Sequence, residues 1–171
     1  FLAALLGPLP SNGESPTSFL EIYRGSIGLG ALWIDVWDAD IATWGGPGEA
    51  SPGGSSSGAN RIWYAFDSAT QTITGTWDDV RQDDDTGGVG PGNAFQVQLK
   101  LLANGALDIV FRYENLQWAE GFSIPYVRNW HEDYEGAAYQ LWEGDGAYDT
   151  APGNIGIPGV WAFQVRDGAL I

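Results

Sequence analysis

The segment "NAFQVQLKLLANGALDIVFRYENLQW", residues 93–118, constrains the fold of this chain more than any other stretch. Apolar and polar residues alternate on both sides of an Asn-Gly pair, and this combination is the strongest short-range sequence signal of a β-hairpin. A two-residue turn at Asn104-Gly105 would place apolar residues opposite charged ones. A three-residue loop, Ala103-Asn104-Gly105, pairs apolar residues along one face, so we predict this loop with Gly105 in the left-handed conformation.

The predicted register gives the hairpin one buried face and one wet face. On the buried face the cross-strand pairs are Leu101–Leu107, Leu99–Ile109, Val97–Phe111 and Phe95–Tyr113. On the wet face Lys100 lies opposite Asp108 and Gln96 lies opposite Arg112, and opposite charges across a ladder are mildly favourable. A hairpin with these two faces is typical of the wall of a sandwich or barrel.

The composition extends this interpretation to the whole chain. With 25 Gly, 9 Pro and a hydrophobic fraction of 44% in 171 residues, the chain is predicted to be one all-β domain, residues 1–171. We expect a mainly antiparallel, sandwich-like fold with long loops and at most short helices. The stretch from Ile27 to Trp37 is predicted as one strand buried on most of both faces. Residues 60–80 are predicted as a second hairpin and residues 160–168 as a last strand, and a short helix is possible at 17–24.

Two stretches lack periodicity and are predicted as long loops, residues 43–60 and 81–92. The first contains "GGSSSG", which looks like a linker, and the second is acidic and then rich in glycine. Loops of this length are either mobile or functional.

The charge and the absence of cysteine exclude several classes of function. A formal net charge of -15 repels phosphate backbones and anionic membrane surfaces, so we expect no binding to nucleic acid. The chain has no cysteine, which excludes disulfides and thiolate metal sites. The apolar start "FLAALLGPLP" is too short to span a bilayer, and it fits either a strand and turn or the remnant of a signal peptide.

Two groups of aspartates could supply the oxygen ligands that Ca²⁺ prefers, which makes calcium the one candidate cofactor. They are Asp35, Asp38 and Asp40 at a strand end, and Asp83, Asp84 and Asp85 in the second long loop. Neither group has the spacing of an EF-hand, which needs glycine at the sixth position and glutamate at the twelfth. The alternative is that these carboxylates cap turns and keep the loops solvated.

The sequence offers weak support for catalysis, and we predict a protein that is not an enzyme. His131 is the only histidine, and a Ser-His-Asp triad would also need an activated serine. No Gly-x-Ser-x-Gly turn is present in the sequence. We therefore expect replacement of His131 by alanine to leave function intact. A pair of carboxylates for glycoside hydrolysis stays open as an alternative.

Several motifs together resemble the NIDO domain, the extracellular module named after nidogen. They are "LWIDVWDAD", "TWDDV", "NAFQVQL", "DIVFRYENLQW" and "GVWAFQVRDG", which cover much of residues 27–118 and 159–168. The chain departs from the family in lacking its first strands, in the segment "SIPYVRNWHEDYEG" and in the acidity of "RQDDDTGG". The resemblance implies an exported, mostly β, adhesion-associated module of bacterial type with no known active site.

Nine tryptophans are too many for one core of this size, so some are expected to face a partner. The resemblance implies that Trp77, Trp118 and Trp161 belong to the core or the sheet rim. Those without a family counterpart, Trp44, Trp130 and Trp142, are the candidates for partner binding.

The leading functional hypothesis is a non-enzymatic interaction module of adhesion type that lies outside the cell or in the periplasm. One alternative is a structural subunit docked on a larger membrane-associated assembly, and another is a carbohydrate-binding module or glycosidase. If the first strands of the family are absent, an open sheet edge invites pairing with another chain. We therefore expect Phe1 and Leu2, in the uncharged first segment, to contact a protein partner.

Overall fold

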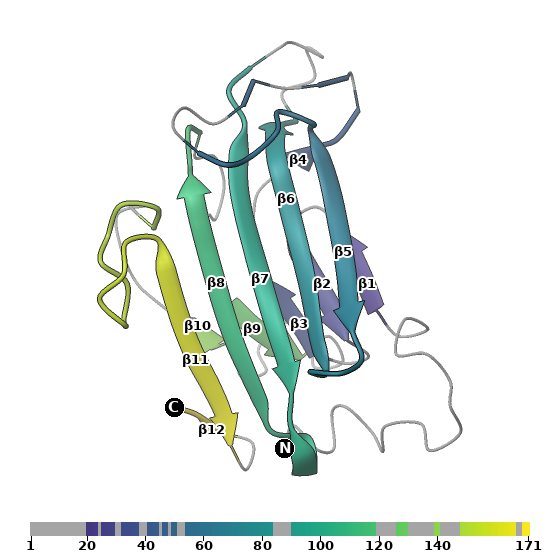
Figure 1. Ribbon diagram of the computed structural model, residues 1–171, viewed down its shortest axis with the longest axis vertical. Helices are drawn as coiled ribbons and strands as arrows, with labels where there is room; N and C mark the ends of the chain where they lie inside the picture. The colour runs from purple at the N-terminus through teal and green to yellow at the C-terminus, as the bar shows by residue number, and fades with distance from the viewer. Residues whose placement is uncertain are drawn as a thin grey trace.

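The computed structural model describes residues 20–23, 25–29, 32–37, 41–44, 46–47, 49–50, 54–83, 90–118, 126–129, 139–140, 148–166 and 169–171. These residues form two antiparallel sheets, one of seven strands and one of five (Figure 1). The predicted class, an all-β and mainly antiparallel fold with a sandwich-like arrangement of two sheets, is confirmed. Within the described part of the chain, no helix has the length and apolar character of a membrane-spanning segment.

The large sheet is built around the hairpin that the sequence specified most clearly. Its strands are β4 (Ile41–Ala42), β5 (Arg61–Asp67), β6 (Thr72–Gln82), β7 (Asn93–Leu101), β8 (Leu107–Asn115), β11 (Val160–Arg166) and β12 (Ala169–Leu170). The order across the sheet is β12-β11-β8-β7-β6, and both β4 and β5 pair with the far side of β6. The predicted second hairpin and last strand are therefore present as β5–β6 and β11.

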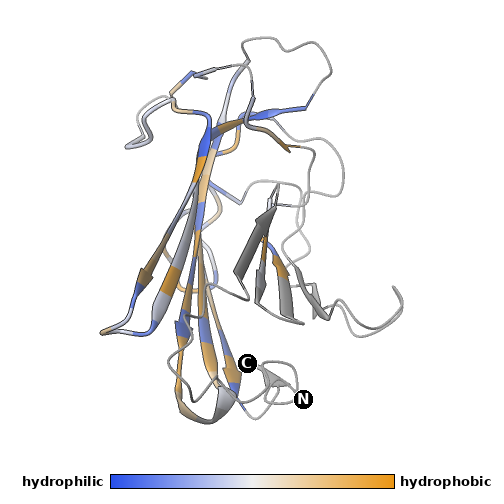
Figure 2. Cartoon of the chain, turned by 90° about the vertical axis from the view of Figure 1, so that its right-hand side faces the viewer, coloured by the Kyte–Doolittle hydropathy of each residue, from blue (hydrophilic) through white to orange (hydrophobic). Residues whose placement is uncertain are grey.

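The small sheet stands against one face of the large sheet (Figure 2). It contains β1 (Leu20–Tyr23), β2 (Ser26–Leu29), β3 (Leu32–Asp35), β9 (Tyr126–Asn129) and β10 (Tyr139–Gln140), in the order β1-β2-β3-β9-β10. Buried side chains of this sheet, Ile27 and Ile34, join the same hydrophobic cluster as those of the large sheet. The core therefore lies between the two sheets.

The central hairpin has the predicted register. Leu102 and Ala106 are joined through the Leu102 N–H at 2.9 Å, residues 103–105 form a short 3₁₀ turn (η2), and Gly105 has a φ of 72°. All of the predicted cross-strand pairs are present, and the apolar ones are buried apart from the half-buried Leu101. Lys100 is opposite Asp108 as predicted, but the ion pair of Asp108 is with Arg166 on β11. The alternation of apolar and polar residues and the preferred conformation of the turn residues were enough to specify this hairpin.

Three predictions for other elements are wrong. The run from Ile27 to Trp37 is not one strand, because Ser26–Leu29 (β2) and Leu32–Asp35 (β3) pair antiparallel with each other. Continuous apolar character does not distinguish one buried strand from two. The possible helix at 17–24 is a strand where it is described, since Leu20–Tyr23 pairs with β2. The predicted loop at 81–92 begins later, because Arg81 and Gln82 extend β6 beside β4.

Aromatic side chains connect the two sheets across the core. Trp37, which follows β3, has its ring 6.4 Å from Phe95, 6.3 Å from Tyr113 and 5.8 Å from Tyr148. The Tyr113 hydroxyl donates to the Val36 carbonyl at 2.7 Å. Burial, with Tyr148 close by, raises the pKa of the Tyr113 hydroxyl well above its usual value, so it stays a hydrogen-bond donor.

Candidate functional site

The outer face of the large sheet, which turns away from the small sheet, carries a row of polar side chains. Thr76, Gln96 and Arg112 are cross-strand neighbours on β6, β7 and β8. Gln96 Nε2 donates to Thr76 Oγ1 at 2.8 Å, and Arg112 Nη1 donates to Gln98 Oε1 at 2.7 Å. These hydrogen bonds fix the side chains on the sheet, so that they present a defined set of polar groups.

A loop rich in serine folds over one end of this row. We call residues 54–58 the serine loop. Glu114 on β8 accepts hydrogen bonds from the backbone N–H groups of Ser55 and Ser56, the latter at 3.2 Å. Asp78 accepts from the Ser57 N–H at 2.8 Å and from the Ser57 hydroxyl at 2.6 Å. The segment that looked like a linker is therefore attached to the sheet by carboxylates, and the linker interpretation is wrong.

A β-bulge in β6 makes this attachment possible. Consecutive side chains on a strand normally point to opposite faces, but the register shifts between Trp77 and Val80, and Asp79 has a φ of 51°. As a result Asp79 also reaches the serine loop, and it accepts from the Ser56 hydroxyl at 2.9 Å and from the Gly58 N–H at 2.6 Å. The strand beside it accommodates the bulge with Gly92, where a Cβ would lie 2.6 Å from the Asp79 carbonyl oxygen.

The serine loop and the polar row enclose a cleft of about 390 Å³ on the outer face. Its polar lining includes Ser56, Ser57, Thr76, Gln96, Arg112 and Glu114. Apolar residues, among them Ala94 and Val160, also line the cleft. The cleft thus combines a mostly apolar surface with hydroxyl, amide, guanidinium and carboxylate groups, which is the usual composition of a ligand-recognition site.

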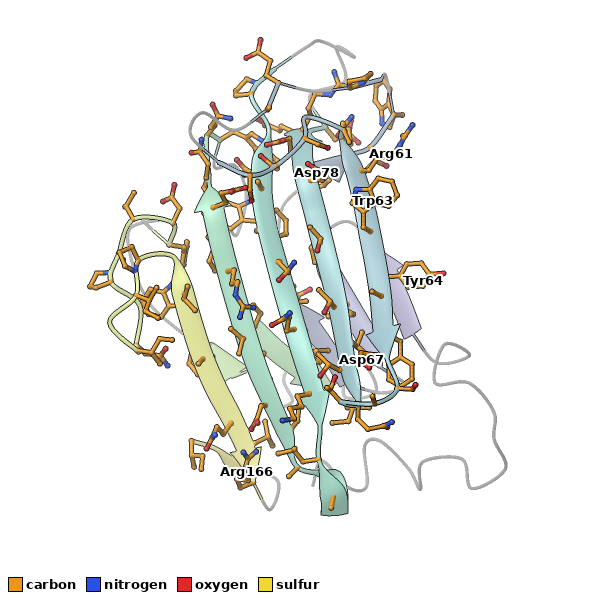
Figure 3. All side chains as sticks on the ribbon, viewed as in Figure 1. Arg61, Trp63, Tyr64, Asp67, Asp78 and Arg166 are labelled. Atoms are coloured by element: carbon orange, nitrogen blue, oxygen red, sulfur yellow. The ribbon has the colours of Figure 1, made fainter. Side chains whose placement is uncertain are left out.

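The hydrogen bonds of this attachment shift the pKa of Asp78. Burial alone would raise the pKa of its carboxyl, but the hydrogen bonds from Ser57 and from the Trp63 indole outweigh this effect and lower the pKa below 3.8. Trp63 Nε1 lies 3.4 Å from Asp78 Oδ2, and the Trp63 ring is 55% exposed. Figure 3 shows Trp63 and Asp78 close together near the same end of β5 and β6.

The backbone around Trp44 is fixed although its ring is exposed. Asn60 is fully buried, and its Nδ2 donates to the carbonyls of Trp44 and Gly46, the latter at 3.1 Å. Arg81 also donates to the Trp44 carbonyl. The Trp44 side chain is 53% exposed, so its predicted exposure is confirmed. Its backbone carbonyl is fixed by the hydrogen bonds from Asn60 and Arg81.

The other predicted site residues divide into described and undescribed ones. Asp35 is buried at the end of β3, where its carboxylate accepts a hydrogen bond from the Ser26 hydroxyl, and Asp83 is half-buried just after β6. Within the described ranges, no three His, Cys, Asp or Glu residues are placed to hold a metal ion. The residues that lie outside the described ranges are Phe1, Leu2, Asp38, Asp40, Asp84, Asp85, Trp130, His131 and Trp142.

Sequence reasoning missed two exposed aromatic residues on β5. Tyr64 is 65% exposed although it lies on the apolar side of its hairpin, and Trp63 was not singled out from the other tryptophans. The alternation on β5 predicts correctly which residues share a face. The exposure of these two rings depends on what packs against this edge strand in the folded chain, which the alternation does not record. Comparison of the chain with models of protein families, with curated proteins and with solved structures finds no match.

Proposed function

We propose that this domain is a non-enzymatic interaction module of adhesion type, exported from the cell, and that the cleft on the outer sheet face is its ligand site. The observation that carries the proposal is the fixed geometry of the cleft. Its polar side chains come from three neighbouring strands, and its roof is attached by three carboxylates. Such preorganisation lowers the entropy cost of binding.

The carboxylates at the cleft support recognition over catalysis. Asp78 and Glu114 each accept hydrogen bonds from the serine loop, so their lone pairs hold the protein's own backbone. A general acid or base would need a carboxylate directed at the ligand. These groups shape the cleft instead.

The resemblance to the NIDO domain supports the same proposal. Two of the quoted motifs, "NAFQVQL" and the end of "DIVFRYENLQW", are joined by the fully buried Asn93. Asn93 accepts from the Gln117 N–H at 2.7 Å and donates to the Trp118 carbonyl at 2.9 Å. The motif residues thus support the wall on which the cleft is built.

A binding experiment with a matched control tests this proposal. We expect the purified domain to bind a member of a panel of extracellular and cell-surface proteins, and Arg112→Ala to weaken that binding because it removes the cation of the cleft. Lys100→Ala is the control, since Lys100 is an exposed cation on the neighbouring strand β7 and does not line the cleft. Equal loss in both variants, or none in Arg112→Ala, would place the ligand elsewhere.

One observation favours a second candidate, a carbohydrate ligand. The half-exposed Trp63 ring stands beside Asp78 at the end of the polar row, and aromatic rings with adjacent hydrogen-bonding groups suit sugar rings. On a glycan array, Trp63→Ala should then abolish binding and Trp63→Phe should retain part of it. A wild-type domain that binds no glycan removes this candidate and leaves the protein ligand.

A further inference from the structure

The two edges of the large sheet differ in the hydrogen bonding of their backbone groups. At the β11 edge, the Asn154 side chain donates to the Ala162 carbonyl at 2.6 Å and accepts from the Ala162 N–H at 2.8 Å. Beyond it, Gln164 and Ile171 exchange backbone hydrogen bonds at 3.0 and 2.8 Å. At the opposite edge, β5 pairs with β6 alone among the described strands. A closed edge cannot take another strand, whereas an open one can.

The open strand carries apolar side chains where edge strands usually carry charge. Trp63 and Tyr64, in the middle of β5, are the most exposed aromatic residues of the strand, at 55% and 65%. Its charges are confined to the two ends, Arg61 and Asp67. Figure 3 shows Tyr64 projecting outward from the free side of the strand. Exposed aromatic groups at a sheet edge mark an interaction surface.

The hydrogen bonds of the neighbouring strands determine which residues of β5 direct their backbone N–H and carbonyl groups to the free edge. The Leu101 N–H donates to the Gln71 carbonyl at 2.9 Å, which makes Thr72–Lys100 a non-hydrogen-bonded pair of the β6–β7 ladder. Thr72 therefore directs its own N–H and carbonyl to the other side, toward Asp67 on β5.

Because the two kinds of pair alternate along a ladder, every second residue of β5 then faces away from β6. Counted from Asp67, these residues are Phe66, Tyr64 and Ile62. They direct their N–H and carbonyl groups to the free edge, and any added strand must pair with them.

An added strand must form its hydrogen bonds with Ile62, Tyr64 and Phe66. In an antiparallel register that meets this condition, the sequence of β5, RIWYAFD, is complementary to itself. With Tyr64 opposite Tyr64 of a second copy, Ile62 meets Phe66, and both are hydrogen-bonded pairs. In the same register Arg61 meets Asp67 at each end. Opposite charges and aromatic or β-branched pairs directly across a ladder are stabilising.

We propose that β5 is a self-association site at which two copies of this chain pair antiparallel, with Tyr64 on the two-fold axis and Arg61 of each copy facing Asp67 of the other. The two large sheets then form one continuous sheet with both clefts on one outer face. The charge of -15 on each copy opposes association at long range, so dimerisation strengthens as salt rises to about 0.15 M, where charges more than ~8 Å apart are screened.

Cysteine cross-linking tests the register directly, because the native chain contains no cysteine. Hydrogen-bonded antiparallel partners have Cα atoms about 5.5 Å apart, within the ~4.4–6.8 Å that a disulfide spans. Tyr64→Cys should therefore form a disulfide-linked dimer under mild oxidation. Ala65→Cys is the matched control, since position 65 meets position 63 of the other copy and the two introduced cysteines lie diagonally, about 7–8 Å apart, beyond disulfide reach. Cross-linking in both variants to the same extent overturns the proposed register.

Sedimentation of cysteine-free proteins provides the second measurement. The wild-type chain should shift from monomer to dimer across a concentration series, and Arg61→Glu, which puts like charges at both ends, should raise the dissociation constant at least about tenfold. Arg61→Lys keeps the charge and should remain close to wild type. A wild-type chain that stays monomeric at every concentration overturns the proposal. That result is expected if β5 pairs with a strand of another protein instead. An Arg61→Glu variant that dimerises like wild type does the same.

Discussion

The single residue Asp78 gives the serine loop a dependence on pH. Its pKa is lowered in the folded protein, so ionised Asp78 stabilises the fold above the unfolded value near 3.8, and this contribution is lost as the pH falls through the folded value. We expect the thermal midpoint of wild type to decrease as the pH is lowered below about 4. The midpoint of Asp78→Asn should decrease less steeply over the same range, because the variant has no charge to lose at this position. Glu49→Gln, on an exposed side chain, is the control and should follow wild type. Parallel curves for wild type and Asp78→Asn would contradict the role of Asp78.

Phe111 tests the core at the same scale. Its ring is fully buried on the inner face of β8 and stacks on Tyr113 at 6.5 Å. Phe111→Ala should cost about 3–5 kcal/mol in the free energy of unfolding measured by urea melts, because it leaves a cavity. Val110→Ala, at a half-buried position one residue away on the outer face, is the control and should cost clearly less than Phe111→Ala because it leaves no buried cavity. A loss below about 1 kcal/mol in Phe111→Ala would show that this face is not core.

The central hairpin is the element whose stability depends most directly on one turn residue. Gly105 closes the loop at a φ of 72°, where a side chain is strained. Gly105→Ala should therefore lower the free energy of unfolding by about 1–2 kcal/mol. Gly90 lies in open space, with nothing within 4 Å of an added Cβ, so Gly90→Ala is the matched control and should be close to neutral. If the two substitutions have the same effect in urea melts, the turn does not set the stability of the hairpin.

At the scale of the whole molecule, the net charge of -15 predicts a response to salt. Self-repulsion destabilises a compact acidic protein, so the thermal midpoint should rise as sodium chloride screens these charges. Calcium chloride and magnesium chloride at equal ionic strength should give equal midpoints if the aspartates only solvate the surface. A larger shift with calcium would show that a calcium site exists, and Asp83→Asn would then identify whether the second acidic loop holds it.

The hairpin register, the face of each of its residues and the left-handed glycine are determined by the sequence alone, because they follow from side-chain alternation and turn chemistry among neighbours. The serine loop is different. Its attachment joins Ser55 to Glu114, 59 residues apart, and depends on a bulge that turns Asp79 to the same face as Asp78. The exposure of Tyr64 likewise depends on how the rest of the chain packs around the edge strand β5. Only the tertiary structure decides such features, since no local pattern records which distant segments lie opposite or which side chains they cover.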